Sequence, residues 1–318
     1  MQKIALGRSG ITVPPVIFGC NVLGWTADKA QSFRLLDALV DAGLNAFDTA
    51  DVYSAWVPGN QGGESETIIG EWLKARGRRN DVVILTKAGM EMPGKGKGLS
   101  PAYLARAVED SLSRLGIERI DLYQAHRDDG ETPHADVLGA FQRMIEAGKV
   151  AAIGASNYTA TRFKEALAAS AAHGLPRFET MQPMYNLMER GIEADLLPLC
   201  AAEGVGAIPY YALASGFLTG KYRGEADLGK SPRGRGVAKY LDARGLRVLA
   251  ALDAVAFRHG ITPGQAALAW FKGRPGMAAP IASATTLEQV AELARAATVT
   301  LDATCAAELD AASAPTAA

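Results

Sequence analysis

The stretch Phe18-Gly19-Cys20-Asn21-Val22-Leu23-Gly24 decides between two architectures that alternate strands and helices. An open doubly wound sheet that binds a dinucleotide usually carries Gly-x-Gly-x-x-Gly directly after its first strand. Here the apolar run at 16–18 is followed by glycines at positions 19 and 24 only, which is a different spacing. The stretch therefore favours a closed barrel of parallel strands over the doubly wound sheet.

Outward from this stretch, short apolar or β-branched runs recur along the chain and alternate with segments of helical apolar spacing. The eight runs lie at 16–18, 46–47, 82–85, 120–123, 150–153, 180–181, 206–208 and 278–281. Buried parallel strands are apolar throughout because helices cover them, and strands that alternate with helices indicate βαβ units. Eight units predict an α/β fold, a (β/α)8 TIM barrel, and 318 residues suit one such domain over 1–318.

Several local signals add to this architecture. Residues 3–6 and 11–13 flank a turn and predict an N-terminal β-hairpin, and the Ala-rich tail at 302–318 predicts one short C-terminal helix. Ser65 and the pair Ser100-Pro101 are expected to begin helices. Residues 230–236, with a proline and three positive charges, are expected to form a long mobile loop.

Composition excludes several classes of protein. The net charge is -1 and the Lys and Arg residues are scattered, so no basic surface for nucleic acid is expected. No apolar run reaches the length of a membrane span or of a signal-peptide core. The three cysteines, Cys20, Cys200 and Cys305, lie far apart with no histidine at metal-ligand spacing. We expect a cytoplasmic protein without a metal, either a monomer or a homo-oligomer.

Polar side chains follow the expected strands. Asp48 ends the second strand with Tyr53 just beyond it, Lys87 ends the third, and His126 ends the fourth. The next three strands add Ser156-Asn157, Gln182 and Tyr210. Each residue alone has a structural explanation, such as a turn cap or a solvated lysine. Because active sites of α/β barrels lie at the carboxyl ends of the strands, the set is expected to converge on one mouth.

Four of these side chains suit reversible carbonyl reduction. When a hydride reaches the carbonyl carbon, negative charge grows on oxygen and a proton donor must lie within hydrogen-bond reach. Tyr53 is the expected donor, and Lys87 is expected to lower its pKa of about 10, since a cation stabilises phenolate. Asp48 would keep Lys87 charged, and His126 would orient the substrate oxygen as an uncharged donor or a relay. Substrates would be small carbonyl compounds or alcohols.

With these residues placed, the chain resembles the aldo-keto reductase superfamily from about Ile4 to about Leu301, and most of all its bacterial aryl-alcohol dehydrogenase-like members. The resemblance is carried by residues 48–54 (DTADVYS), 85–87 (LTK), 120–126 (IDLYQAH), 154–158 (GASNY) and 210–222 (YYALASGFLTGKY). It places the family's catalytic tetrad on Asp48, Tyr53, Lys87 and His126. Relatives in this superfamily bind NADP(H) extended across the barrel mouth.

The resemblance also implies a cofactor site. Ser156, Asn157 and Gln182 would hold the nicotinamide carboxamide, as their donors and acceptors suit an amide, beside Asp48. Tyr210 would stack on the nicotinamide ring. The pyrophosphate would lie along Leu213, Ser215, Gly216 and Lys221.

The expected adenosine end departs from the family pattern. It falls on Ser283, Thr285, Gln289 and Glu292, where many relatives carry Arg or Lys for a 2′-phosphate and Asn at the position of Leu293. The resemblance and two nearby cations, Arg233 and Arg235, favour NADP(H), and NAD(H) stays possible because a bidentate arginine is the usual discriminator.

The substrate pocket is expected to include Trp25 and Trp56 together with Tyr53 and His126, and also Phe217 and Arg127. Core packing is an alternative for Trp25. Aldehydes, ketones and aldoses all remain open as substrates.

Two other functions stay open. The chain could be a redox-sensing or regulatory subunit with slow turnover, like the potassium channel β subunits of the same superfamily. A barrel hydrolase or isomerase that uses Asp48 and His126 would leave Gln182, Tyr210 and the Ser156-Asn157 pair without a task.

Overall fold

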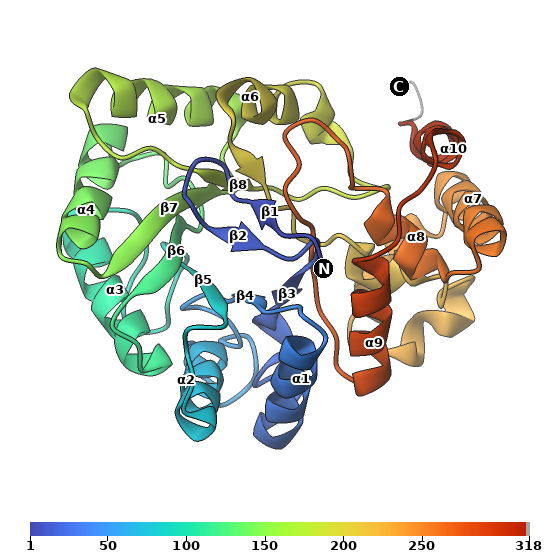
Figure 1. The fold of residues 1–318 in the computed structure, drawn as a ribbon, viewed down its shortest axis with the longest axis horizontal. Helices are drawn as coiled ribbons and strands as arrows, with labels where there is room; N and C mark the ends of the chain where they lie inside the picture. Colours follow the sequence, from blue (N-terminus) through green and yellow to red (C-terminus); the bar gives the residue numbers. More distant parts are fainter. Residues whose placement is uncertain (316–318) are drawn as a thin grey trace.

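A computed structural model describes residues 1–315 and confirms the predicted barrel (Figure 1). Eight parallel strands follow one another in the order β10-β3-β4-β5-β6-β7-β8-β9. Their bounds are β3 Ile17–Gly19, β4 Ala46–Asp48, β5 Val83–Ala88, β6 Ile120–Ala125, β7 Val150–Ser156, β8 Thr180–Gln182, β9 Gly206–Ala207 and β10 Ile281–Ala282. All eight predicted strands are therefore present.

Backbone hydrogen bonds close the barrel between its last two strands. The Ala207 N–H donates to the Gly276 carbonyl at 2.8 Å, and the Ala278 N–H donates to the Ala207 carbonyl at 2.8 Å. The segment before β10 thus pairs with β9, while β10 itself pairs with β3. Closure removes the exposed strand edges that an open sheet would present.

Strands β5, β6 and β7 extend further than their apolar runs predicted. β5 continues through Lys87, β6 through Gln124, and β7 through Ser156. These polar residues interrupt the apolar pattern and lie at the carboxyl ends of the strands, where the site forms. The apolar runs alone therefore end before the strands do, because polar site residues occupy the last strand positions.

Helices surround the barrel (Figure 1). The α-helices are α1 Lys29–Asp41, α2 Glu64–Arg76, α3 Pro101–Leu115, α4 His134–Glu146, α5 Ala160–His173, α6 Leu196–Glu203, α7 Ala243–His259, α8 Pro263–Ala269, α9 Leu287–Ala296 and α10 Ala303–Ser313. Short 3₁₀ helices lie at η1 Cys20–Val22, η2 Gly191–Glu193, η3 Ala214–Thr219, η4 Glu225–Lys230 and η5 Gly234–Tyr240. None of the helices in residues 1–315 combines the length and apolar character that crossing a membrane requires.

One predicted helix start is confirmed and one is wrong. Ser100 caps α3 by accepting the Tyr103 N–H, with Pro101 in the first turn. Ser65 is not a cap, because α2 begins one residue earlier, after Gly63. The Ser65 hydroxyl instead donates to the Cys20 carbonyl at 2.9 Å, which ties α2 to the end of β3.

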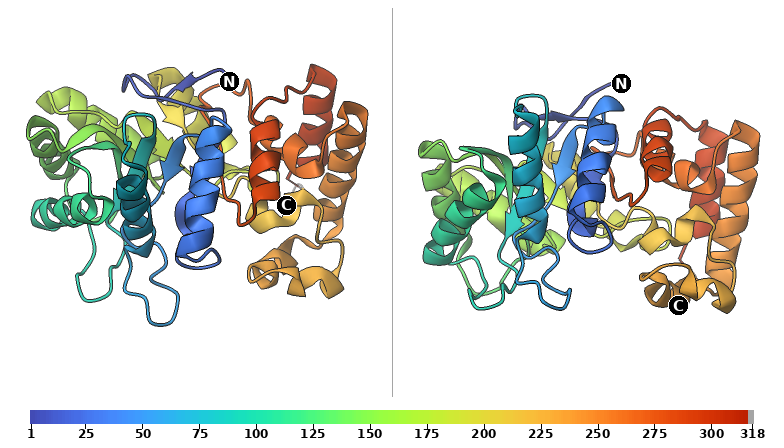
Figure 2. Two further views of the ribbon diagram at one scale, coloured as in Figure 1. Left: turned by 60° about the horizontal axis from the view of Figure 1, so that its bottom comes forward. Right: turned by 90° about the horizontal axis from the view of Figure 1, so that it is seen from below.

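The two ends of the barrel differ (Figure 2). The predicted hairpin, β1 Ile4–Ala5 paired with β2 Thr12–Val13, covers the end that carries the amino termini of the strands. At the opposite end lie the long loops with η4 and η5, so the expected loop at 230–236 carries 3₁₀ turns. The predicted C-terminal helix is α10, capped by Asp302; residues 316–318 of the expected tail lie outside the described residues.

Candidate active site

The four residues expected to carry catalysis meet at the carboxyl ends of β4, β5 and β6. The Lys87 ammonium donates to Asp48 Oδ2 at 2.7 Å, to the Thr49 carbonyl at 2.8 Å and to the Tyr53 hydroxyl at 2.9 Å. Lys87 is 0% exposed and Asp48 1% exposed. An ammonium group has three donors, so all three are used and its direction is fixed.

The Asp48 carboxylate is held by two amides as well as by Lys87. Its Oδ1 accepts from Gln182 Nε2 at 2.8 Å and from Gln124 Nε2 at 3.3 Å. A buried ion pair is stable only when further hydrogen bonds satisfy the remaining lone pairs. Sequence reasoning missed Gln124, although a glutamine at the polar end of an apolar strand was a signal for it.

Tyr53 keeps its proton in the free chain. Burial and the Asp48 carboxylate raise the pKa of the Tyr53 phenol well above its usual value. This direction is opposite to the one expected from the Lys87 cation alone, because the buried site also contains the negative charge of Asp48. A protonated phenol is the form that can donate a proton to a substrate.

His126 follows β6 and borders Tyr53, with ring centroids 6.0 Å apart. Burial and the nearby cations Lys87 and Arg127 lower the pKa of His126 well below its usual value. The backbone of His126 is fixed on both sides: its N–H donates to the Ala88 carbonyl at 2.8 Å and its carbonyl accepts from Asn157 at 3.0 Å. The imidazole is therefore neutral near pH 7 and suits an uncharged hydrogen-bond donor.

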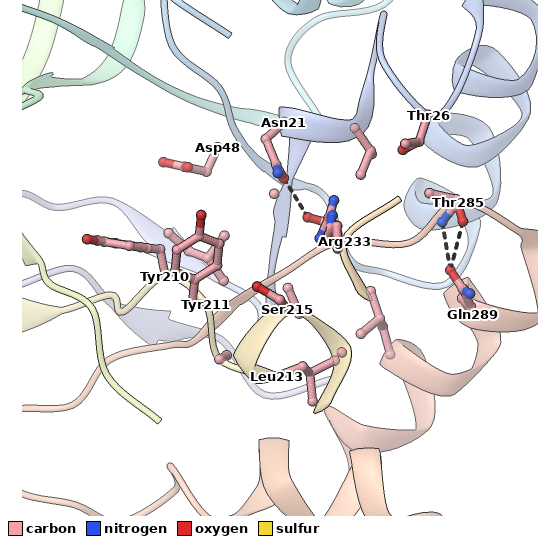
Figure 3. A pocket seen from close by; sticks show the side chains of 18 of the residues that line it. Asn21, Thr26, Asp48, Tyr210, Tyr211, Leu213, Ser215, Arg233, Thr285 and Gln289 are labelled. Carbon is pink, nitrogen blue, oxygen red and sulfur yellow. Dashed lines mark hydrogen bonds between the residues drawn. The ribbon is translucent and has the colours of Figure 1, made fainter. Parts of the chain in front are cut away.

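A single elongated cavity of about 920 Å³ runs from this cluster across the barrel mouth (Figure 3). All the residues expected to bind cofactor line it: Asp48, Ser156, Asn157, Gln182, Tyr210, Leu213, Ser215, Gly216, Lys221, Arg233, Ser283, Thr285, Gln289 and Glu292. Tyr53, His126, Trp25, Trp56 and Arg127 line it as well. Lys87 is not among the lining residues and bonds to two that are, Asp48 and Tyr53.

Two further residues do not line the cavity: Phe217, expected in the substrate pocket, and Arg235, expected as a cation near the cofactor phosphate. Phe217 is fully buried and packs on Tyr240, with ring centroids 5.5 Å apart, because η3 turns its ring away from the cavity. Arg235 is exposed and does not contribute to the cavity wall. In contrast, Asn21 and Tyr211 line the cavity and were missed. Asn21 is the polar residue after the first strand, in the stretch where only glycines were considered.

The end of the cavity next to Asp48 is a hydrogen-bonded frame. The Tyr210 hydroxyl donates to Asn157 Oδ1 at 2.8 Å, and the Ser156 hydroxyl donates to the Gln182 carbonyl at 2.8 Å. Asn157 has a φ of +55°, a left-handed conformation that asparagine tolerates better than most residues. These bonds hold Tyr210, Asn157 and Ser156 as one rigid wall.

The middle of the cavity has unusual backbone. Tyr211, Ala214, Ser215 and Gly216 all adopt positive φ, at 55°, 48°, 58° and 94°. Each non-glycine residue in this region costs about 1 to 3 kcal/mol, and such strain concentrates at ligand sites. The conformation serves a site that must present backbone groups to a ligand.

Arg233 is the principal cation over this middle part (Figure 3). Its guanidinium lies 5.2 Å from the Trp25 ring centroid, and burial lowers the pKa of Arg233. It has no carboxylate partner within residues 1–315. A half-buried cation without a counter-charge suits an anionic ligand such as a phosphate.

The far end of the cavity is neutral or acidic. Gln289 Oε1 accepts from the Thr285 N–H at 2.8 Å and from its hydroxyl at 3.2 Å (Figure 3). The Ser283 hydroxyl donates to Asn21 at 2.7 Å, and Glu292 accepts from Thr262 at 2.7 Å. The polar groups here are thus bonded to one another and offer no cation.

A separate cluster forms where α7 ends and α10 begins. His259 Nε2 lies 3.3 Å from Asp302 Oδ2 and 3.4 Å from Cys305 Sγ, although their spacing in sequence gave no sign of it. Arg258 also lies 3.5 Å from the Cys305 sulfur. The three potential ligand atoms lie within 4.8 Å of one another, and the absence of a metal stays a prediction.

Comparison with known proteins assigns the family. The sequence profile of the Aldo/keto reductase family matches residues 15–314. The chain belongs to this family. An aldo-keto reductase of Schizosaccharomyces pombe, yakc [NADP(+)], is 32% identical over 270 residues, which cover 81% of this chain and 76% of the relative.

Two further relatives of this aldo/keto reductase carry provisional assignments. One is a voltage-gated potassium channel subunit beta of Arabidopsis thaliana, 33% identical over 92% of this chain and 90% of its own. The other is the aryl-alcohol dehydrogenase AAD16 of Saccharomyces cerevisiae, 34% identical over 69% of this chain and 70% of its own. The chain is therefore an aldo/keto reductase-type oxidoreductase with aryl-alcohol dehydrogenase-like relatives.

Proposed function

We propose that this chain reduces aldehydes or ketones to alcohols, reversibly and with NADP(H), and that Tyr53 is the proton donor. The observation that carries the proposal is the 2.9 Å hydrogen bond between Lys87 Nζ and the Tyr53 hydroxyl, at the wall of a cavity that fits an extended ligand. A reduced nicotinamide supplies a hydride to the carbonyl carbon. Every other part of the reaction falls to residues of the chain.

The chain's residues divide the remaining work. The Tyr53 hydroxyl donates its proton to the carbonyl oxygen as negative charge grows there. The ammonium of Lys87 stabilises the phenolate left behind, and Asp48 holds that ammonium in place. Neutral His126 donates a hydrogen bond to the same oxygen and orients it. In alcohol oxidation the same groups act in the opposite order.

The residues that line the cavity match the chemical groups of a nicotinamide dinucleotide. Tyr210 offers an aromatic face, and Ser156, Asn157 and Gln182 offer amide-matching groups at the end nearest Tyr53. Left-handed backbone around Ser215 and the unpaired Arg233 suit phosphate oxygens. These features support the cofactor assignment independently of the family.

NADP(H) is proposed over NAD(H) because Arg233 is available for phosphate and because a relative is named for NADP(+). Glu292 works against a 2′-phosphate, since a carboxylate near the ribose favours a free hydroxyl. Fluorescence titration with NADPH and NADH tests the preference. Tighter binding of NADPH is expected, and equal dissociation constants would exclude it.

The channel-subunit relative favours a second function, a redox-sensing subunit that binds cofactor and turns over slowly. The complete bonded set of Asp48, Lys87, Tyr53 and His126 supports an enzyme instead. Cofactor oxidation with a panel of aldehydes separates the two. Turnover at rates typical of enzymes supports the reductase, and cofactor binding with almost no turnover supports the subunit.

We further propose that the chain works as a single domain in the cytoplasm. The main hydrophobic cluster includes residues from Val16 to Leu309, so one core spans nearly the whole sequence. All three cysteines are free and buried, which suits a reducing compartment.

A further inference from the structure

Arg127 is a cation at the cavity mouth without a structural partner. It follows His126 directly and lines the cavity. Its guanidinium makes no hydrogen bond or ion pair within the described range 1–315. An exposed arginine on an ordinary surface needs no explanation, but this one lies beside the reacting groups.

The acidic neighbours of Arg127 are committed elsewhere. Asp128 forms a two-point ion pair with Arg162, at 2.6 and 3.0 Å. Asp129 accepts from the backbone N–H of Leu99 at 2.7 Å and from Thr132 at 2.7 and 2.9 Å. Asp128 is therefore paired with another arginine and Asp129 is held by neutral donors, and neither carboxylate pairs with the Arg127 guanidinium.

The charge of Arg127 acts on the reaction end of the cavity. It contributes to lowering the pKa of His126, and it also opposes the rise in the pKa of Tyr210 that burial causes. Arg127, His126 and Tyr210 line the same cavity, which is the geometric counterpart of these effects. The other cations of the cavity wall, Lys221 and Arg233, belong to the segment after β9, and the Arg233 guanidinium lies over the Trp25 ring.

The same cavity also has aromatic and apolar lining. Trp25 and Trp56 pack edge to face, with ring centroids 5.7 Å apart, and Trp56 also contacts Tyr53 at 6.1 Å. Met90 and the half-exposed Tyr211 complete the wall. A flat ring would pack against these side chains.

We propose that Arg127 binds a carboxylate on the substrate, so that the preferred substrates are aromatic aldehydes with a carboxylate on the ring. The inference rests on the proposed function and names its substrate class. The aldehyde oxygen would lie at Tyr53 and His126, the ring against the tryptophan pair, and the carboxylate at the guanidinium. Arginine matches a carboxylate with two parallel hydrogen bonds.

The test compares substrates that differ in charge and hardly in shape: 3- and 4-carboxybenzaldehyde against the corresponding formylbenzamides. The readout is the ratio of kcat/KM for acid over amide, measured with NADPH in the wild type and in Arg127→Gln. For the better isomer we expect a wild-type ratio of about 10, the value of one partly exposed charge-assisted contact. In Arg127→Gln the ratio falls to near 1, mainly because KM for the acid rises. In the wild type the ratio decreases when salt is added.

Arg119→Gln is the matched control. Arg119 is an exposed arginine that lies just before β6, whereas Arg127 lies after the other end of this strand. The Arg119→Gln substitution therefore removes the same charge at a position away from the cavity. In Arg119→Gln the ratio of kcat/KM for acid over amide stays at the wild-type value. A ratio near 1 in the wild type, or an unchanged ratio in Arg127→Gln, overturns the proposal.

Two further measurements distinguish a failure of the Arg127 proposal from a cofactor role of Arg127 and from a failure of the reductase function. If Arg127→Gln weakens NADPH binding by the same factor as it lowers the ratio, the guanidinium serves the cofactor and the proposal is overturned. If the wild type reduces neither the acids nor the amides, the proposed reductase function itself fails. Reduction of the amides without any preference for the acids refutes only the role of Arg127.

Discussion

The two ends of the cavity are built differently. At the Tyr53 end, buried charges and amides bond to one another, and Lys87 uses all three of its donors. At the Gln289 end, polar side chains bond to one another without a cation, as Gln289 in α9 does with Thr285 in the loop after β10. Chemistry needs fixed charges in a dry environment, whereas recognition of a ribose needs only matched polar groups. Substitutions should therefore cost more at the first end than at the second.

The largest effect is expected for Tyr53→Phe. The variant keeps the ring and removes only the proton donor, so reduction should slow about 10³-fold, within the range of general acid catalysis. NADPH binding should change less than about 2-fold, because the phenol hydroxyl bonds to Lys87 and lies at the substrate end. Steady-state kinetics measures the rate of reduction, and fluorescence titration measures NADPH binding. Comparable turnover in the variant would remove Tyr53 from its role.

Lys87→Met should damage both activity and stability. It leaves the Asp48 carboxylate buried without its counter-charge, which costs about 3 kcal/mol of the unfolding free energy. Turnover should fall about 10²-fold because the phenolate loses its cation. Denaturant unfolding and kinetics measure these effects. The double variant Asp48→Asn/Lys87→Met should recover stability and stay inactive; recovery of activity would contradict the account.

Arg233→Gln should have a smaller effect, in the middle of the cavity. Loss of a charge-assisted contact to phosphate should weaken NADPH binding about 10-fold. If Arg233 contacts the 2′-phosphate, NADH binding weakens less, and if it contacts the pyrophosphate, both weaken alike. Arg235→Gln is the control, since Arg235 is exposed outside the cavity. Unchanged binding of both cofactors by Arg233→Gln would exclude the phosphate role.

The smallest effect concerns His126 and pH. Because the fold lowers the pKa of His126, the folded state disfavours its protonation and the unfolded state takes up the proton first. The stability that neutral His126 contributes is present above about pH 6.5 and is lost as the pH falls below it. His126→Asn should lose less stability on acidification than the wild type. His173→Asn, in an exposed position, is the control, and denaturant unfolding across pH compares the three proteins.

The sequence predicted the barrel because apolar strands and helical spacing survive in every unit. Strand ends were placed within one residue where polar residues marked them, as with Lys87 in β5 and Ser156 in β7. Ser65 illustrates a limit: its hydroxyl bonds across the fold to Cys20 instead of capping its own helix. Such long-range contacts have no local pattern in the chain.

Site residues in motifs that match those of a family were predicted well. Residues whose position depends on loop conformation were predicted less well. The Tyr53 and Lys87 contact follows from two strand ends meeting. The burial of Phe217 follows from consecutive left-handed residues in η3, and glycine and serine give little warning of that geometry. The direction of the pKa shift of Tyr53 follows from its burial and from the nearby Asp48 carboxylate, and burial depends on the folded structure.

The most direct test replaces Tyr53 alone with a fluorinated tyrosine, whose phenol is more acidic. The pH dependence of carbonyl reduction is then compared with that of the wild type. Since the fold raises the pKa of Tyr53, wild-type reduction should persist beyond about pH 10, whereas the fluorinated enzyme should lose activity at lower pH. Loss of activity at the same pH in both enzymes would contradict the claim that this phenol donates the proton.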